Sequence, residues 1–266
     1  MTGKTLRLKN IFREDGRALI IALDHAAIAG AMEGLADPSR IVGEVTKAGA
    51  DAILVTKGML GKARDSVARG AGVILRISGG FTLLSNPDSF EDRVISNVET
   101  ALKWGADAVA MTIKFGHPRE GEFIEEASKI ADLCDSWGMP LLVEVMPKGE
   151  RAKKMGKGEA FSVSCRSAFE LGADFIKTAY PGAAEEFRKM AKECPAPIVI
   201  LGGEKVESHY ELFRMVKESL DAGGAGVAMG RNVWGYDSPS RMVRALTLLI
   251  HKNATVEKAS NALYED

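Results

Sequence analysis

The 266-residue sequence predicts an α/β protein built as a single (β/α)8 TIM barrel, on the strength of three observations. Eight short apolar runs are spread along the chain, and amphipathic segments separate them. A Gly-Ala-Asp triplet recurs at residues 49–51, 105–107 and 172–174, with a degenerate Gly-Gly-Ala-Gly copy at 223–226. The chain also has the length of roughly 250 residues that such a barrel commonly needs.

The apolar runs are expected to be strands, because strands that are packed on both faces are continuously apolar. In chain order they cover residues 18–23, 52–56, 73–77, 108–113, 141–145, 175–176, 198–201 and 227–229. The segments between them show helical spacing of apolar residues, as in Val94, Val98, Ala101 and Leu102. Eight alternating units predict parallel strands closed into one ring, so we expect one domain over residues 1–266.

The Gly-Ala-Asp copies precede every second strand. The Gly ends a helix, where a left-handed backbone conformation is favoured. We expect the Asp to be a turn residue at the base of the barrel, because catalytic groups in this fold lie at the opposite, C-terminal ends of the strands.

Composition and charge exclude several classes of protein. The net charge of −1 gives no general attraction to nucleic acid or to a membrane surface. No apolar run approaches the roughly 20 residues that span a bilayer, and the polar, basic first ten residues do not resemble a signal peptide. Three widely separated cysteines fit a reducing cytoplasm. We therefore expect a cytoplasmic protein with no nucleic-acid or membrane partner.

Polar residues at the C-terminal ends of the strands are the candidates for chemistry in such a barrel. These ends would gather Asp24, Lys57, Lys114, Glu144, Lys177 and Arg231 in one rim. His25 directly follows the first strand and is a further candidate. The third strand ends in Arg76-Ile77-Ser78-Gly79, to which we assign no role.

Lys177 is the most informative of these residues, because it ends a strand that is expected to be buried. Burying an ammonium group is costly unless it is paired or loses its proton. A neutral lysine amine attacks carbonyl carbon, as in Schiff-base enzymes, and several nearby cations favour that neutral form. Asp24 would shuttle protons and orient the amine. The alternative is a lysine that only ends the strand and reaches water.

Two glycine-rich turns follow the seventh and eighth strands, at Gly202-Gly203 and Gly230-Arg231. Barrels frequently bind phosphate here, through backbone N–H groups and a helix N-terminus. Arg231 would add a bidentate donor. The sequence thus predicts a phosphate site at these four residues, with Lys57 and Lys114 as further cations, unless the glycines only permit tight turns.

Metal or cofactor chemistry finds no support in the sequence. The four histidines are scattered and show no metal-ligand spacing. A P-loop, a dinucleotide-binding fingerprint and a nucleophile elbow are all missing from the sequence. We therefore expect a reaction that needs neither a metal nor a cofactor.

Several stretches together resemble the archaeal-type class I fructose-bisphosphate aldolase family. They are Leu23-Asp24-His25, residues 175–178 with Tyr180, residues 197–200 with Gly202-Gly203, and residues 229–232. That family also contains the 2-amino-3,7-dideoxy-D-threo-hept-6-ulosonate synthases and the autoinducer-2 thiolase-like enzymes. The resemblance covers nearly the whole chain. It implies a Schiff base on Lys177, proton transfer by Asp24, phosphate at the glycine turns, and a homo-oligomer that is a pentamer or a decamer.

One position departs from the family pattern. The aldolases and the heptulosonate synthases have a tyrosine proton donor near the end of strand five, where this sequence has Met146. A thioether cannot donate a proton. Period-two alternation puts Glu144 on the same face as Met146. We hypothesise that Glu144, or a lysine such as Lys114, takes the acid/base role, with Tyr180 as a less favoured substitute.

The sequence predicts a metal-independent, Schiff-base aldolase that cleaves or forms a carbon–carbon bond in a phosphorylated ketose. Fructose 1,6-bisphosphate is the first candidate substrate. A heptulosonate synthase-type transaldolase and an autoinducer-2 thiolase-like enzyme are alternatives within the family. A phosphosugar isomerase or epimerase would share the phosphate site without needing Lys177. A non-enzymatic sugar-phosphate binder would bind without turnover.

Overall fold

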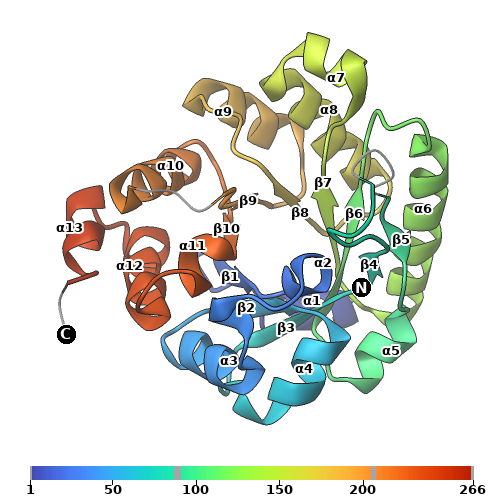
Figure 1. Cartoon of the computed structure of the whole chain (residues 1–266). Coiled ribbons are helices and arrows are strands. Elements are labelled where there is room, and N and C mark those ends of the chain that lie inside the picture. The colour runs from blue at the N-terminus through green and yellow to red at the C-terminus, as the bar shows by residue number, and fades with distance from the viewer. Residues whose placement is uncertain (1, 87–90, 205–207, 265–266) are drawn as a thin grey trace.

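Eight parallel strands close into a ring with helices around it (Figure 1). The computed structural model describes residues 2–86, 91–204 and 208–264. The ring strands are β1 (Ala18–Ala22), β2 (Ala52–Val55), β3 (Gly72–Arg76), β6 (Ala108–Ile113), β7 (Leu141–Val145), β8 (Phe175–Thr178), β9 (Ile198–Leu201) and β10 (Gly226–Met229). Their order around the ring is β1-β10-β9-β8-β7-β6-β3-β2, which confirms the predicted (β/α)8 barrel.

Helices connect the strands and cover the outside of the ring (Figure 1). They are α1 (Thr2–Leu8), α2 (Ala26–Ala29), α3 (Pro38–Lys47), α4 (Lys57–Ala63), α5 (Val98–Lys103), α6 (Glu120–Trp137), α7 (Gly149–Met155), α8 (Lys157–Glu170), α9 (Ala184–Glu193), α10 (His209–Asp221), α11 (Arg231–Trp234), α12 (Pro239–Lys252) and α13 (Val256–Asn261), with 3-10 turns η1 (Glu33–Leu35) and η2 (Arg64–Ser66). Several begin at a capping side chain: Thr56, for example, accepts a hydrogen bond from the Met59 N–H at 3.2 Å. Such a cap satisfies an N–H group that the helix itself leaves without a partner.

The strand residues divide between two cores. One core fills the inside of the ring and includes Ile20, Leu54, Ile74, Leu142 and Phe175. Their neighbours in sequence pack outward against the helices, in the second and larger core. Successive side chains of a strand point to opposite faces, so residues at even spacing from an inner core residue also face the inside of the ring.

The Gly-Ala-Asp triplets lie at the base of the barrel, as predicted. Asp51, Asp107 and Asp174 each bind one residue of a neighbouring strand twice: the carboxylate accepts its N–H and the aspartate N–H donates to its carbonyl. The carboxylate contacts are 2.6 Å to Leu19, 2.9 Å to Val73 and 2.8 Å to Leu141. The repeat therefore fixes the alignment of neighbouring strands.

The degenerate copy of the repeat uses a glycine where the other copies have aspartate. Gly226 has a positive φ of 123°. A Cβ atom there would lie 2.0 Å from the carbonyl oxygen of Ala18. The ring closes between β10 and β1 at this point, and only glycine allows the two backbones to approach so closely.

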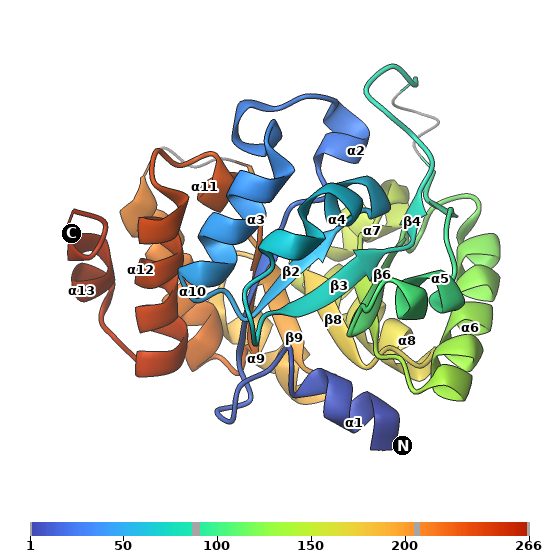
Figure 2. The ribbon, with the colours of Figure 1, turned by 90° about the horizontal axis from the view of Figure 1, so that it is seen from below.

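The N-terminal segment crosses the base and binds all three aspartates. Lys4 pairs with Asp174 at 2.9 Å, Asn10 donates to Asp107 at 2.7 Å, and Arg13 binds Asp51. Figure 2 shows α1 at this end of the ring and α2 at the other. The mouth opposite the base is therefore the end at which the strands finish.

A small antiparallel hairpin, which the sequence did not reveal, rises from the mouth after β3. It pairs β4 (Ser78–Gly79) with β5 (Arg93–Val94). The expectation that Val94 belongs to a helical stripe is wrong, because Val94 lies in β5 and α5 begins at Val98. In the part of the chain that the structure describes, no helix combines the length and apolarity needed to cross a bilayer.

Candidate active site

Strand alternation carries a set of polar side chains to the mouth. Glu144 is two residues beyond the inner core residue Leu142, Lys177 two beyond Phe175, and Arg76 two beyond Ile74. The deeper layer of the ring is therefore apolar and the layer above it is charged. The prediction from strand alternation that Glu144 and Met146 share one face is confirmed, since both residues line the same cavity.

The mouth encloses a cavity of about 520 Å³. It is lined by nine of the ten residues that the sequence put forward for the site: Asp24, His25, Lys57, Glu144, Lys177, Gly202, Gly203, Gly230 and Arg231. Arg76, Phe81, Asp92, Thr112, Met146 and Trp234 are further lining residues. The structure thus brings together side chains from every side of the ring.

Lys177 lies in the wall of this cavity and is almost fully buried, with 7% of its side chain exposed. Its Nζ is 2.8 Å from Oε1 of Glu144 on the adjacent strand β7. The amine is thus held by one carboxylate and opens to the cavity rather than to bulk water. The alternative that Lys177 only ends a strand and reaches water is wrong.

Arg76 joins the carboxylates on either side of the mouth. Its Nε donates to Asp24 at 2.8 Å and its Nη2 donates to Glu144 at 2.5 Å. Its Nη1 donates to the Thr112 hydroxyl at 2.8 Å. Asp24, Arg76, Glu144 and Lys177 therefore form one continuous chain of ion pairs, which we call the mouth chain.

The mouth chain shifts the pKa values of Glu144 and Arg76. Burial alone would raise the pKa of Glu144, but Lys177 and Arg76 outweigh it and lower that pKa to about 2. Burial opposes the charge of Arg76, yet Asp24 and Glu144 raise its pKa above the ordinary value for arginine. Glu144 is consequently an anion at every pH at which the enzyme would work.

His25 lies beside the mouth chain at the start of α2. Burial lowers its pKa, and the charges of Arg231 and Lys177 lower it further against the opposing effect of Asp24. The imidazole is therefore neutral at pH 7 and can accept a proton. Its ring faces Trp234 with 6.4 Å between the ring centroids.

The two glycine turns meet on the side of the cavity formed by β9 and β10. Asn232 ties them together, because its side-chain nitrogen donates to the carbonyls of Gly202 at 2.8 Å and Glu204 at 3.0 Å. A Cβ atom on Gly230 would lie 2.7 Å from the Ala22 carbonyl oxygen. Glycine there lets the turn approach β1, and Gly230 and Arg231 line the cavity together with Gly202 and Gly203.

The two further predicted cations differ in position. Lys57 is exposed, lines the cavity and begins α4. Lys114 is buried outside the lining residues, where its Nζ pairs with Asp92 at 2.9 Å and lies 4.5 Å from the centre of the Phe81 ring. Because the charge of Lys114 is already engaged by Asp92, the geometry does not support its predicted roles in phosphate binding or acid/base catalysis.

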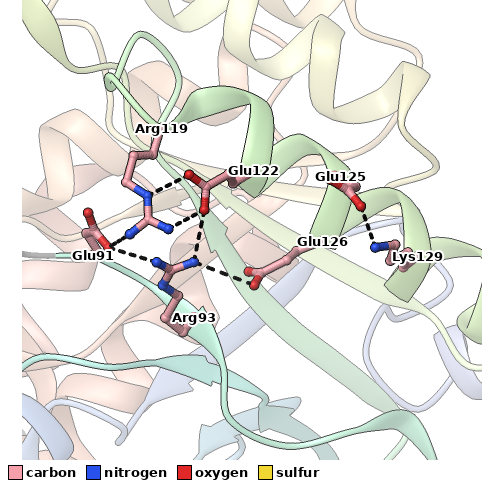
Figure 3. Close-up of polar contacts among 7 residues, drawn as sticks. All are labelled: Glu91, Arg93, Arg119, Glu122, Glu125, Glu126 and Lys129. Atoms are coloured by element: carbon pink, nitrogen blue, oxygen red, sulfur yellow. Dashed lines mark hydrogen bonds and ion pairs between the residues drawn. The ribbon is translucent and has the colours of Figure 1, made fainter.

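The β4–β5 hairpin forms the wall that carries Phe81, Asp92 and Ile95. Salt bridges join the β5 side of this hairpin to the start of α6 (Figure 3). Arg93 lies 3.2 Å from Glu91 and 3.3 Å from Glu122, and Arg119 binds the same two carboxylates. We call Glu91, Arg93, Arg119 and Glu122 the outer cluster, and it fixes the wall from outside the cavity.

Tyr180 does not take the place of the missing tyrosine. Its hydroxyl donates to Glu218 at 3.1 Å, and it is not among the lining residues. Burial and Glu218 raise the pKa of Tyr180 to about 12.

Within the described ranges, no group of three or more His, Cys, Asp or Glu side chains is arranged to hold a metal ion.

Comparison with known proteins identifies the family. Residues 18–235 match the family described as DeoC/LacD family aldolase, which is most of the chain. The chain belongs to the DeoC/LacD family of aldolases. This aldolase is 34% identical over 258 residues to 2-amino-3,7-dideoxy-D-threo-hept-6-ulosonate synthase 1 of Archaeoglobus fulgidus, a match that covers 97% of this chain and 95% of the relative. It is 29% identical over 272 residues to an uncharacterized aldolase of Saccharolobus solfataricus, covering 99% of this chain and all of the relative.

Solved structures give the same picture. A Schiff-base-forming fructose-1,6-bisphosphate aldolase is 30% identical with a TM-score of 0.85, over 93% of this aldolase and 100% of that chain. An archaeal fructose-1,6-bisphosphate aldolase, with its catalytic lysine covalently bound to the carbinolamine intermediate of the substrate, is 29% identical with a TM-score of 0.84, over 93% and 99%. The suspected family is therefore confirmed.

The sequence left three important residues of this aldolase without a role. Arg76 met the criterion that selected the others, since it ends a ring strand, but its partners Asp24, just after β1, and Glu144, on β7, are far away in sequence. Asp92 lies within a hairpin, directly before β5, and the strands of this hairpin have only two residues each. Asn232 was noted only as part of a motif, and its bridge between the glycine turns depends on the fold.

Proposed function

We propose that this aldolase forms a Schiff base between Lys177 and the ketone of a phosphorylated ketose, and that it makes or breaks the adjacent carbon–carbon bond. The observation that carries the proposal is the buried Lys177 amine, which opens into a cavity reaching the glycine turns of β9 and β10. A phosphate at those turns would place the ketone of the same sugar within reach of the amine. The solved relatives named above add support, because they include a Schiff-base-forming aldolase.

The reaction begins when the neutral amine adds to the ketone carbon and gives a carbinolamine. Its hydroxyl group takes up a proton and leaves as water, and an iminium ion remains. A base then removes the proton of the C4 hydroxyl, the C3–C4 bond breaks, and its electron pair moves to the iminium nitrogen. An aldehyde departs, and the resulting enamine is protonated at C3 and hydrolysed, which frees the ketone product and Lys177.

Glu144 stabilises the positive charge in this sequence. Its carboxylate lies 2.8 Å from the nitrogen that becomes the iminium, and its pKa of about 2 keeps it ionised. That pKa also makes Glu144 a poor proton donor at neutral pH, which argues against the acid/base role that the sequence suggested. We assign the proton transfers to Asp24 and His25, the latter being neutral at pH 7.

Phosphate recognition falls to Gly202, Gly203, Gly230 and Arg231. Backbone N–H groups at a helix N-terminus and a guanidinium group together suit a phosphate dianion. Fructose 1,6-bisphosphate is the first candidate substrate, and its second phosphate would lie near Lys57. Two of the solved relatives are fructose-1,6-bisphosphate aldolases.

A heptulosonate synthase-type reaction is the second candidate, and the wall opposite the glycine turns favours it. In the ring order, β6 lies across from β10 and β3 across from β9. The opposite wall presents Phe81, Ile95 and the Asp92 carboxylate, with Lys114 neutralised by Asp92. Such a wall suits a sugar whose far end carries no second phosphate. A relative at 34% identity carries the synthase name.

Borohydride trapping tests the proposal. The protein is incubated with dihydroxyacetone phosphate and sodium borohydride, and the adduct is located by peptide mass spectrometry. We expect a reduced adduct on Lys177 and none in Lys177→Met. Inorganic phosphate should slow the trapping by competing for the glycine turns. Absence of any adduct in the wild-type protein, or an adduct on another lysine, would contradict the proposal.

A substrate panel separates the two candidate reactions. Cleavage of fructose 1,6-bisphosphate is compared with cleavage of a 6-deoxy hexulose 1-phosphate, in the wild type and in Met146→Tyr. If the missing tyrosine limits aldol cleavage, Met146→Tyr raises turnover of both sugars. A preference for the monophosphate would favour the synthase-type reaction.

The cytoplasmic location and the pentameric or decameric assembly stay predictions.

A further inference from the structure

We infer that Arg76 is a positioning residue of the reaction. It holds the Glu144 carboxylate in place beside Lys177 and binds the Asp24 carboxylate on its other side. The inference rests on the proposed Schiff base at Lys177. It concerns a residue to which neither the sequence motifs nor the family resemblance gives a role. Arg76 acts through its neighbours, because its contacts are with protein side chains.

Three hydrogen bonds define the position of Arg76. The guanidinium donates from Nε to Asp24, from Nη1 to Thr112 and from Nη2 to Glu144, at 2.8, 2.8 and 2.5 Å. Only 10% of the side chain is exposed. A planar guanidinium presents its N–H groups in a fixed fork, so three partners in three directions leave it one orientation.

Arg76 connects two carboxylates that lie on either side of its own strand. It ends β3, which is two strands from β1 in one direction around the ring and two strands from β7 in the other. Asp24 follows β1 and Glu144 lies on β7. Thr112, on the strand β6 that lies between β3 and β7, accepts a hydrogen bond from Arg76. A single side chain therefore connects Asp24 and Glu144 across the mouth.

The charges explain why a cation is needed there. With Lys177 cationic, as an ammonium or as an iminium, the mouth chain has two positive and two negative groups. Without Arg76, two partly buried carboxylates would share one cation. Like charges in a buried site favour protonation of one carboxylate. Arg76 is one of the two groups that lower the pKa of Glu144, so its removal would raise that pKa and weaken the negative charge beside the iminium ion.

The first experiment measures Glu144 directly in the protein without substrate. Protein labelled with 13C at the glutamate carboxyl carbons is titrated by NMR, and Glu144→Gln assigns the Glu144 signal. We expect Glu144 to titrate near pH 2 in the wild type and at a clearly higher pH in Arg76→Met. An unchanged titration of Glu144 in Arg76→Met would overturn the inference. This readout does not depend on any substrate, so it separates failure of the inference from failure of the proposed function.

The second experiment follows the rate of borohydride trapping against pH. Misplacement of catalytic groups by a distant change costs about 100-fold in rate, which is the loss we expect for Arg76→Met at pH 7. We also expect the acid limb of the rate profile to move to higher pH. Arg188→Met, which removes an exposed arginine paired with Glu185 on α9, is the matched control and should leave both rate and profile unchanged. A slower rate with an unshifted profile would reduce Arg76 to a structural role and overturn the inference.

A third variant keeps the test decisive if Arg76→Met does not fold, as judged by circular dichroism. Arg76→Lys retains the positive charge but not the three-way fork. We expect Glu144 to keep its low titration point in this variant while trapping slows by about 10-fold or more. Trapping at the wild-type rate in Arg76→Lys would show that the orientation given by the guanidinium is not needed, and would contradict the inference.

Discussion

The base and the mouth of the barrel both hold carboxylates, but they hold them in different ways. Asp51, Asp107 and Asp174 at the base accept hydrogen bonds from backbone N–H groups of the strands. Asp24 and Glu144 at the mouth are bound by the side chains of Arg76 and Lys177. The same chemical group therefore aligns strands at one end of the ring and faces a cavity at the other.

The kind of partner separates structural from chemical roles. A backbone N–H keeps its proton and cannot move without disturbing a strand. A lysine side chain can lose its proton, form a covalent bond and return. Both sets have side-chain partners, and what distinguishes the base carboxylates is that each also accepts a strand N–H. Substitutions at the two ends should accordingly separate activity from stability.

Lys177→Met should have the largest effect, and the effect should fall on activity. Loss of the nucleophile removes the covalent route, so we expect turnover to fall by about 1,000-fold or more. Glu144 keeps Arg76 as a partner, so the fold should survive. Steady-state kinetics and circular dichroism provide the test, and appreciable turnover by Lys177→Met would contradict the assigned role.

Arg231→Ala should have the next largest effect, at the glycine turns. A hydrogen bond to a charged group contributes about 1.5–3 kcal/mol, so we expect KM for the phosphorylated sugar to rise by roughly 10-fold to 100-fold. The substitution leaves the mouth chain intact, so kcat should change much less than KM. A matched loss for an unphosphorylated ketose would show that Arg231 does not recognise the phosphate.

Asp107→Ala should act in the opposite sense, on stability. The substitution leaves the Val73 N–H and the Asn10 side chain without their acceptor. We expect a loss of about 1–3 kcal/mol in the free energy of unfolding, which corresponds to a fall of roughly 3–10 °C in Tm for a chain of this size. kcat/KM measured well below the Tm should stay at the wild-type value. A large loss of kcat/KM with an unchanged Tm would break the comparison between base and mouth.

Arg119→Ala should have the smallest effect. Arg119 belongs to the exposed outer cluster, where water and salt screen the ion pairs (Figure 3). We expect a change in Tm smaller than that of Asp107→Ala, and one that disappears when NaCl is raised to about 0.5 M. A salt-independent drop in Tm would show that the outer cluster carries more of the fold than its exposure suggests.

Most of the fold could be predicted because the signals are local. Continuous apolar runs mark the ring strands, and the Gly-Ala-Asp repeat marks the junctions at the base. The hairpin was missed because strands of two residues, Ser78–Gly79 and Arg93–Val94, show no alternation. Val94 was consequently assigned to a helical stripe.

The candidate site could be predicted as a list of residues but not as a set of pairs. Strand ends gave nine lining residues, because the fold brings those ends together. Which cation meets which carboxylate depends on contacts across the ring. Arg76 was therefore given no role, and Lys114 was expected at a phosphate although Asp92 of the hairpin neutralises it.

The segment across the base has a consequence for the order of assembly during synthesis. Lys4, Asn10 and Arg13 leave the ribosome before their partners Asp174, Asp107 and Asp51. The last of these contacts, between Lys4 and Asp174, therefore forms only after residue 174 has been made. Contacts so distant in sequence form slowly. Docking of the first helix would therefore report that the barrel has closed at least as far as its sixth ring strand.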